Sequence, residues 1–354
     1  MNIYTEQENK KYQAKIDLLL ATLPQFETTY VNAVARTKSR RTILSYLQKH
    51  AAFFEYMSTN SSVFCSQPIT TYVLEDLNRV TLDDANNFLT CIYNRQRDDA
   101  GRSNSNNTVE IYISALSSLF GYFYKNEYIK NNPFTAVERK RNKTDKPLYL
   151  QNEDNLAFYD NVLTGKGLTE KQKATREKQG TAYRDYIICR TLGSTGIRVS
   201  ELVGLDYDKI DLERKQFKVI RKGNKPQTIY MSDKLAEEMQ EYITDSRPLF
   251  IANQNEKGLF LVAQGKYKGT RLSIKTVESI VKKYATAQGL PESWRFTPHK
   301  LRHTYAMNVL RKSGNLRLTQ QLMGHENVAT TTIYSRMLET DLEQAKNLGE
   351  YTED

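Results

Sequence analysis

The chain has 354 residues and a formal net charge of +10, with 51 lysines and arginines against 41 acidic residues. Its 39% hydrophobic and 26% charged residues are typical of a folded protein of about two domains and exclude a disordered or fibrous chain. No run approaches the ~18 apolar residues of a membrane span, the N-terminal stretch is too polar for a signal peptide, and three scattered cysteines fit a reducing compartment, so we expect a cytoplasmic protein without membrane association.

The first half of the chain is predicted to be helical. Apolar residues recur at helical spacing over about 37–57, 81–92 and 107–128. The second of these segments opens with a threonine and two acidic residues, the pattern of an acid-capped helix. For the third segment, Asn107 or Thr108 is the expected N-cap. These stripes predict a helical core and by themselves indicate no function.

The face of the 37–57 segment that lies away from its apolar stripe is basic. Such a face is either simply solvated or follows a line of phosphates. The candidate DNA-binding residues on it are Lys38, Arg40, Arg41, Thr42 and Tyr46.

Pro133 ends the helical region, and the polar stretch that follows is expected to link two domains. This basic linker either lies against DNA or is solvated. Its candidate DNA-binding residues are Arg139, Lys140, Arg141 and Lys143. We predict a division into an N-terminal extension (1–29), a helical domain (30–137), the linker (138–149) and a second domain (150–354).

The second half mixes helix and strand. We predict a helix over 182–193 that ends in a glycine-rich turn, a short helix over 198–203, a β-hairpin over 216–231, an amphipathic helix over 273–288 and a helix from Thr297 to about Lys312.

Three basic residues stand at helix starts in this half. Arg198 follows the glycine turn, where its guanidinium either grips phosphate oxygens or pairs with Glu201. His299 and Arg302 are three residues apart and therefore share one helix face. His303 follows His299 by four residues, but no HExxH motif or spaced carboxylate accompanies it, so we expect no metal site.

Further chemical groups follow in the chain. His325 comes directly after Gly324, which is expected to close a short helix, and Tyr334 stands nine residues further on. Together with the two arginines, His299 and the hairpin-turn residue Lys222, they compose a phosphoryl-transfer site that needs no metal or other cofactor. The arginines would neutralise the non-bridging oxygens, the tyrosine would attack phosphorus and the lysine would protonate the leaving oxygen.

The ordered string TGIRVSEL … RKGNK … TPHKLRHTYA … LMGHENVATTTIY resembles the signature of the tyrosine recombinase (phage integrase) family, over about residues 150–345. The helical 30–135 region, with Thr42 and Tyr46 four residues apart, is similar to the family's core-binding domain. The resemblance implies a mainly α fold with a small β-sheet in the catalytic domain. It also implies a two-domain, C-shaped DNA clamp.

The resemblance also assigns roles. In the family, two arginines bind the scissile phosphate, a lysine protonates the 5′ oxygen and a histidine serves as acid/base and phosphate ligand. A second histidine hydrogen-bonds the phosphate, and a tyrosine forms the 3′-phosphotyrosyl intermediate. The matching residues, with the supporting acidic residue last, are Arg198, Arg302, Lys222, His299, His325, Tyr334 and Glu201.

Within the family the chain most resembles the Xer branch, and especially XerS-type proteins, because a basic insertion spans about 165–180. This implies strand exchange on double-stranded DNA through a Holliday junction by a homotetramer, with a DNA translocase as a possible partner, in chromosome dimer resolution. The same chemistry would serve the integrase of a mobile element. A type IB topoisomerase, a non-catalytic regulator and an enzyme of small phosphorylated metabolites are three further candidate functions.

A helical apolar stripe follows the predicted nucleophile. It would dock either on a neighbouring subunit or on its own domain. Its residues are Leu338, Leu342, Ala345 and Leu348.

Overall fold

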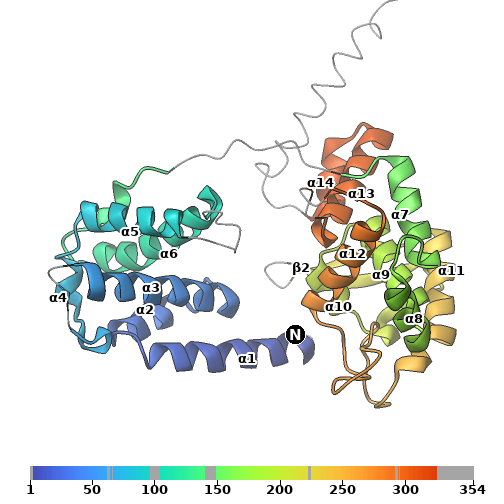
Figure 1. Cartoon of the computed structure of the whole chain (residues 1–354), viewed down its shortest axis with the longest axis horizontal. Helices are drawn as coiled ribbons and strands as arrows, with labels where there is room; N and C mark the ends of the chain where they lie inside the picture. The colour runs from blue at the N-terminus through green and yellow to red at the C-terminus, as the bar shows by residue number, and fades with distance from the viewer. Residues whose placement is uncertain are drawn as a thin grey trace, which may run out of the picture. The chain divides into compact units, whose positions relative to one another are not determined.

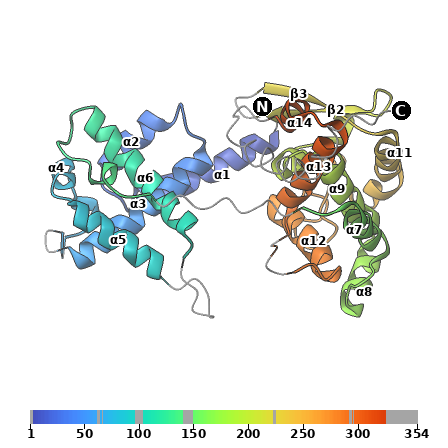
Figure 2. The same cartoon turned by 90° about the horizontal axis from the view of Figure 1, so that it is seen from above.

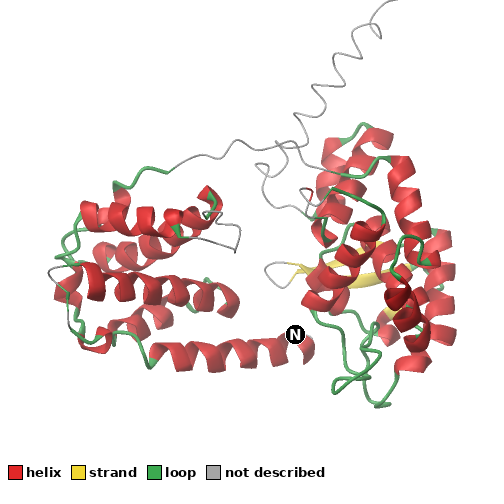
Figure 3. Ribbon diagram, viewed as in Figure 1, coloured by secondary structure: helices red, strands yellow, loops and turns green. Residues whose placement is uncertain are grey.

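The computed structural model of the chain describes residues 3–61, 64–65, 67–95, 104–139, 149–221, 225–291, 294 and 296–324. It divides into two compact units, Met1–Lys143 and Thr144–Asp354 (Figure 1). The described residues are mostly helical, and their one sheet has three strands (Figure 3). The expected fold class, mainly α with a small sheet in the second half, is confirmed.

The first unit is an assembly of helices around one apolar core. Its helices are α1 (Ile3–Leu20), α2 (Phe26–Val34), α3 (Arg40–Asn60), α4 (Leu74–Leu77), α5 (Leu82–Asn94) and α6 (Asn106–Lys125), with 3₁₀ turns at Ile69–Thr71 and Pro133–Thr135. The core takes in residues from α1 and α2 as well as from the later helices. Among the described residues, no helix is long and apolar enough to span a membrane.

Aromatic rings dominate this core. Phe53 is fully buried and packs edge-on against Phe88 and Phe120, with ring centroids 5.2 and 6.1 Å apart. One polar pair lies among these rings: His50 Nδ1 is 3.1 Å from the Glu27 carboxylate, and His50 Nε2 is 3.1 Å from the Ala115 carbonyl. Buried polar groups require such partners, so the pair is accommodated inside the core.

Local capping explains where two of these helices begin. The acid-capped start of α5 is confirmed, because Thr81 Oγ1 accepts from the backbone N–H of Asp84 while Asp84 accepts from the N–H of Thr81. For α6 the cap expected at Asn107 or Thr108 is wrong. The carbonyl of Ser105 already accepts from the N–H groups of Thr108 and Val109, so the cap is Ser105.

The second unit surrounds a central helix, α9 (Ala182–Thr195), which contacts α7 (Asn152–Thr164) and α13 (Pro298–Ser313). The remaining helices are α8 (Glu170–Gln179), α10 (Val199–Val203), α11 (Asp233–Glu241), α12 (Ile274–Ala287) and α14 (Leu316–Met323). A 3₁₀ turn (Tyr207–Lys209), a π-helical turn (Tyr242–Ser246) and a second 3₁₀ turn (Arg247–Phe250) complete the connections.

The sheet of this unit is antiparallel, in the order β1 (Ile210–Asp211), β2 (Gln216–Arg221) and β3 (Lys225–Tyr230). The β2–β3 hairpin confirms the prediction over 216–231, with Arg221 opposite Lys225 as the pair next to its turn. Its turn, 222–224, lies outside the described residues. Figure 2 shows the end of α14 beside β2 and β3.

The α9 helix ends later than its sequence suggests. Gly193 does not terminate it but lies inside it, at a point where any side chain would overlap the Tyr159 hydroxyl. The helix ends at Gly196, which has a positive φ of 63° and lies against the Tyr305 ring. Gly193 therefore allows close packing between helices, whereas Gly196 ends the helix. The position of Gly196 fixes where the chain turns toward Arg198.

The basic insertion over 165–180 contains α8. Gly165 and Gly180, both with positive φ, end α7 and α8. Arg176, buried on α8, donates to the carbonyls of Val162 and Leu163 at the end of α7. The insertion is therefore a packed helix rather than an open loop.

Candidate active site

Arg198 precedes α10 and is tied to Glu201 in the same turn. The Arg198 backbone N–H donates to Glu201 Oε2 at 2.7 Å, and its Nη1 lies 3.0 Å from Glu201 Oε1. The Arg198 side chain is 40% exposed, whereas that of Glu201 is 6% exposed. The predicted ion pair with Glu201 is therefore present. The exposed part of the guanidinium still faces solvent and can meet a phosphate.

Arg302 is held from two sides. It lies in the first turns of α13 and is almost completely buried. Its guanidinium donates to the carbonyl of Gly196, two residues before Arg198, and to the carbonyl of Met323 at the end of α14. Arg302 therefore joins the segment before Arg198 to the segment before His325, although 106 and 21 residues separate it from these carbonyls.

His299 stands one turn before Arg302 on α13, as its spacing predicts. Desolvation, followed by the positive charges of Arg302, Lys300 and Arg198, lowers the pKa of His299 below its usual value near 6.5. The imidazole is therefore neutral near pH 7, and a neutral imidazole can either accept a proton or donate its one N–H. Arg302 lies on the same helix face as His299 and binds the carbonyl of Gly196, two residues before Arg198, so the fold brings these three residues to the same part of the unit.

The ring of His303 lies against the ring of His299. The two rings are 4.4 Å apart and nearly perpendicular. Among the described residues, no group of three or more His, Cys, Asp and Glu side chains is arranged to hold a metal ion.

Arg221 is a site residue that sequence reasoning did not predict. It is the last residue of β2, and its Nη1 lies 2.9 Å from both carboxylate oxygens of Glu201. Its Nε donates to Gln227 Oε1 at 2.7 Å, and Gln227 in turn donates to the Gln321 carbonyl at 3.1 Å. The only sequence signal is one more basic residue beside Lys222, which does not distinguish a buried ion pair from a solvated charge.

The end of α14 is where these contacts converge. The carbonyls of Gln321, Leu322 and Met323 accept from Gln227, Arg221 and Arg302 respectively. The helix then ends at Gly324, with a φ of 60°, as predicted. Three of the predicted catalytic residues, Lys222, His325 and Tyr334, lie outside the described residues.

The predicted DNA-binding residues of the first unit lie on and just before α3. Lys38 Nζ is 5.2 Å from the Tyr46 ring centroid, and Arg40 Nε donates to Gln13 on α1. Arg41 is exposed, and the Thr42 N–H is capped by Ser39. These groups leave a basic, partly exposed helix start.

In the predicted linker, Arg139 is described and pairs weakly with Ser117 and Glu110 of α6, at 3.3 and 3.8 Å. Lys140, Arg141 and Lys143 lie outside the described residues.

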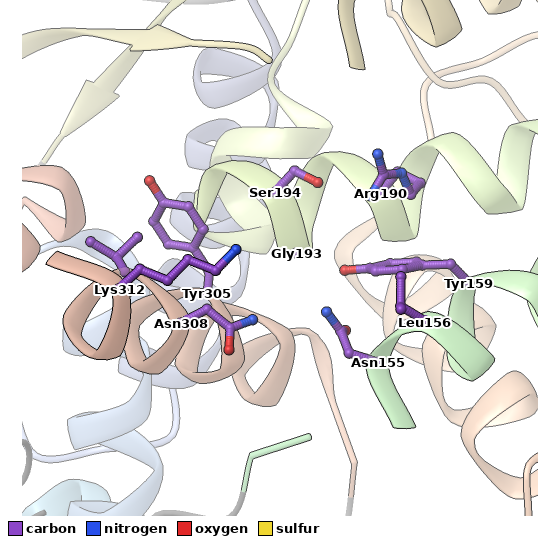
Figure 4. A pocket seen from close by; sticks show the side chains of 10 residues that line it. Asn155, Leu156, Tyr159, Arg190, Gly193, Ser194, Tyr305, Asn308 and Lys312 are labelled. Carbon is purple, nitrogen blue, oxygen red and sulfur yellow. The ribbon is translucent and has the colours of Figure 1, made fainter. Parts of the chain in front are cut away.

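A pocket of about 490 Å³ opens between α7, α9 and α13 (Figure 4). Tyr159, Arg190, Tyr305 and Lys312 are among its lining residues, whereas the described members of the predicted catalytic set, Arg198, His299 and Arg302, are not.

Comparison with known protein families gives two matches. The family model described as "Phage integrase family" matches residues 162–340, and "Phage integrase SAM-like domain" matches residues 22–143. The first of these spans contains the whole predicted catalytic set, from Arg198 to Tyr334.

Curated relatives of the chain include Xer recombinases. The chain is 33% identical over 239 residues to tyrosine recombinase XerC of Thermodesulfovibrio yellowstonii, covering 67% of this chain and 73% of that protein. It is 29% identical over 325 residues to XerC of Caldanaerobacter subterraneus, covering 89% and 83%.

Solved structures share the fold. The structure of XerH site-specific recombinase bound to palindromic difH substrate matches with a TM-score of 0.66 and 22% identity, covering 96% of this chain and 90% of XerH. The Tn1549 transposon integrase in complex with circular intermediate DNA matches with a TM-score of 0.58 and 19% identity, covering 88% and 94%. With Arg302 joined to the segment before Arg198 and both halves matched by the family's two domains, the chain belongs to the phage integrase family, the tyrosine recombinases that cleave and rejoin DNA through a tyrosine intermediate.

Proposed function

We propose that this tyrosine recombinase exchanges strands at a specific double-stranded DNA site, using Tyr334 as nucleophile, and that its role is Xer-type chromosome dimer resolution. The observation that carries the proposal is that Arg302 joins the segment before Arg198 to the end of α14, through the Gly196 and Met323 carbonyls, with His299 one turn away on the same helix. The Xer relatives support the role.

In the proposed reaction, the Tyr334 oxygen attacks the scissile phosphorus while the bond to the 5′ oxygen breaks. Arg198 and Arg302 neutralise the non-bridging oxygens as charge develops on them. His299, neutral near pH 7, accepts the tyrosine proton or donates to a phosphate oxygen, and His325 adds a second hydrogen bond. Lys222 gives its proton to the departing 5′ oxygen. Attack by the 5′-hydroxyl of a partner strand then reverses these steps and releases Tyr334.

Binding is proposed to use both units and the basic linker, because the chain has an excess of ten positive charges. The first unit would contribute Lys38, Arg40, Arg41, Thr42 and Tyr46. The linker would contribute Arg139, Lys140, Arg141 and Lys143. Most of these contacts would go to phosphates and set register rather than read bases.

The assembly is proposed to be a homotetramer on DNA, because two duplexes exchange four strands and each protomer supplies one tyrosine. We further propose that a DNA translocase partner activates the tetramer. The C-terminal stripe of Leu338, Leu342, Ala345 and Leu348 would bind a neighbouring protomer.

The test is covalent trapping in EDTA without nucleotide. Wild type and Tyr334→Phe are incubated with nicked duplexes taken from the host replication terminus and from DNA that flanks the gene. A denaturant-resistant protein–DNA adduct with wild type alone is the expected result. Capture by the terminus duplex supports dimer resolution, whereas capture only by flanking DNA supports the integrase of a mobile element.

Two outcomes would overturn the proposal. An adduct that persists in Tyr334→Phe assigns the nucleophile to another residue. Tight, salt-sensitive binding of both duplexes without any adduct, even with the translocase added, indicates a non-catalytic regulator.

A further inference from the structure

A second arginine shares the buried carboxylate of Glu201. Arg221 is 8% exposed, and its Nη1 lies 2.9 Å from each oxygen of Glu201. Arg198 approaches the same carboxylate at 3.0 Å but keeps 40% of its side chain exposed. The carboxylate therefore has an inner partner, Arg221, and an outer partner, Arg198.

The charges of these three groups do not cancel. A single carboxylate between two guanidinium groups leaves one positive charge in excess. If Arg221 were absent, Glu201 and Arg198 would form a neutral pair, and Arg198 would be less able to bind a phosphate. A carboxylate that is 6% exposed also requires a close cation, since an unpaired buried charge is strongly destabilising.

Arg221 is also fixed against the end of α14. A side-chain carbon at Gly324 would come within 2.9 Å of both Arg221 Nε and Gln227 Oε1. Arg221 Nη2 reaches the Leu322 carbonyl at 3.4 Å. In sequence, Arg221 directly precedes Lys222, and Gly324 directly precedes His325.

We propose that Arg221 is a positioning residue for strand cleavage: it takes up the negative charge of Glu201 and so leaves the positive charge of Arg198 to the scissile phosphate. This inference rests on the proposed function. Burial lowers the pKa of Arg221 and the Glu201 charge opposes that shift, as expected for a counter-ion in a dry site.

The test compares Arg221→Gln, Glu201→Gln and the double variant in the full chain. The measurement is the first-order rate of adduct formation on a nicked duplex at saturating protein. Arg221→Gln should slow the rate about 10- to 100-fold, because Glu201 then neutralises Arg198. Adding Glu201→Gln should recover most of that loss, because the unbalanced carboxylate is gone.

The matched control is Arg247→Gln. Arg247 is also buried in this unit, where it donates to the carbonyls of Gly258 and Glu256 and lies over the Tyr207 ring, away from the Glu201 carboxylate. Its rate should equal that of wild type at a temperature where both are folded. If Arg221→Gln does not fold, the comparison of the double variant with Glu201→Gln still applies, and the proposal expects their rates to agree within a few-fold.

A substrate with an uncharged scissile linkage distinguishes the proposed electrostatic role of Arg221 from structural damage. With a methylphosphonate in place of the scissile phosphate, one negative oxygen is lost, and the defect of Arg221→Gln should shrink. A wild-type rate in Arg221→Gln, or a double variant slower than Arg221→Gln, would overturn the inference. Failure of wild type itself to form an adduct would instead overturn the proposed function.

Discussion

The two units differ in how their interiors are held. The first is packed by aromatic rings around Phe53, with the His50–Glu27 contact as a buried polar pair among them. The second contains buried arginines that bind backbone carbonyls. They include Arg184, Arg221, Arg247 and Arg302.

This difference has a physical consequence. Apolar packing is non-directional and is roughly proportional to buried area, so it provides stability with modest demands on geometry. A guanidinium has donors in a fixed plane, so each arginine–carbonyl contact sets both distance and direction. Under the proposed function, the first unit binds DNA through its surface and can rely on apolar packing. The second unit would have to place two arginines on one phosphate, which requires the directional contacts of guanidinium groups.

Replacing Arg302, which joins two elements of the second unit, should have the largest effect on the rate of DNA cleavage. Arg302→Lys removes the fork that spans the Gly196 and Met323 carbonyls. We expect the adduct-forming rate to fall at least about 10²- to 10³-fold, while DNA affinity falls much less. Single-turnover trapping alongside a binding titration measures both. A variant that cleaves at the wild-type rate would show that Arg302 has only a structural role.

A change in the aromatic core should affect the stability of the first unit rather than the rate of DNA cleavage. Phe53→Ala leaves a cavity among Phe88, Phe120 and their neighbours, and we expect it to lower the free energy of unfolding of the first unit by about 3–5 kcal/mol. Denaturant unfolding, followed by hydrogen exchange in each unit, measures this loss. Chemistry in the second unit should be unchanged where the protein remains folded. A loss of cleavage rate without a loss of stability would contradict the division between the units.

A smaller effect is expected for the dependence of folding stability on pH, which His299 contributes. The pKa of His299 is lowered in the folded chain, so the unfolded chain binds its proton first as pH falls through about 6.5. Stability contributed by this group is therefore present above that pH and is lost progressively below it. The wild-type minus His299→Gln difference in unfolding free energy should rise with pH in this window. A flat difference would show that the environment of His299 does not disfavour its charge.

Local signals predict most of the elements. The capping box at Thr81, the hairpin over 216–231 and the start of α13 at Thr297-Pro298 each depend on residues within a few positions of one another, so sequence alone indicates them. The predicted end of α9 is wrong because Gly193 packs against Tyr159, a residue on α7 that no local pattern connects to it.

Short motifs and hydrophobic periodicity were enough to indicate the family and the order of helices and hairpin, and to single out candidate catalytic residues. Which charges meet depends instead on the packing of distant elements. Arg221 pairs with Glu201, and Arg302 donates hydrogen bonds to the carbonyls of Gly196 and Met323. These contacts join residues that are 20 to 106 positions apart. Such contacts form only when α10, α13, α14 and the sheet pack together, and the role of a charge follows from its burial and its partners rather than from its neighbours in sequence.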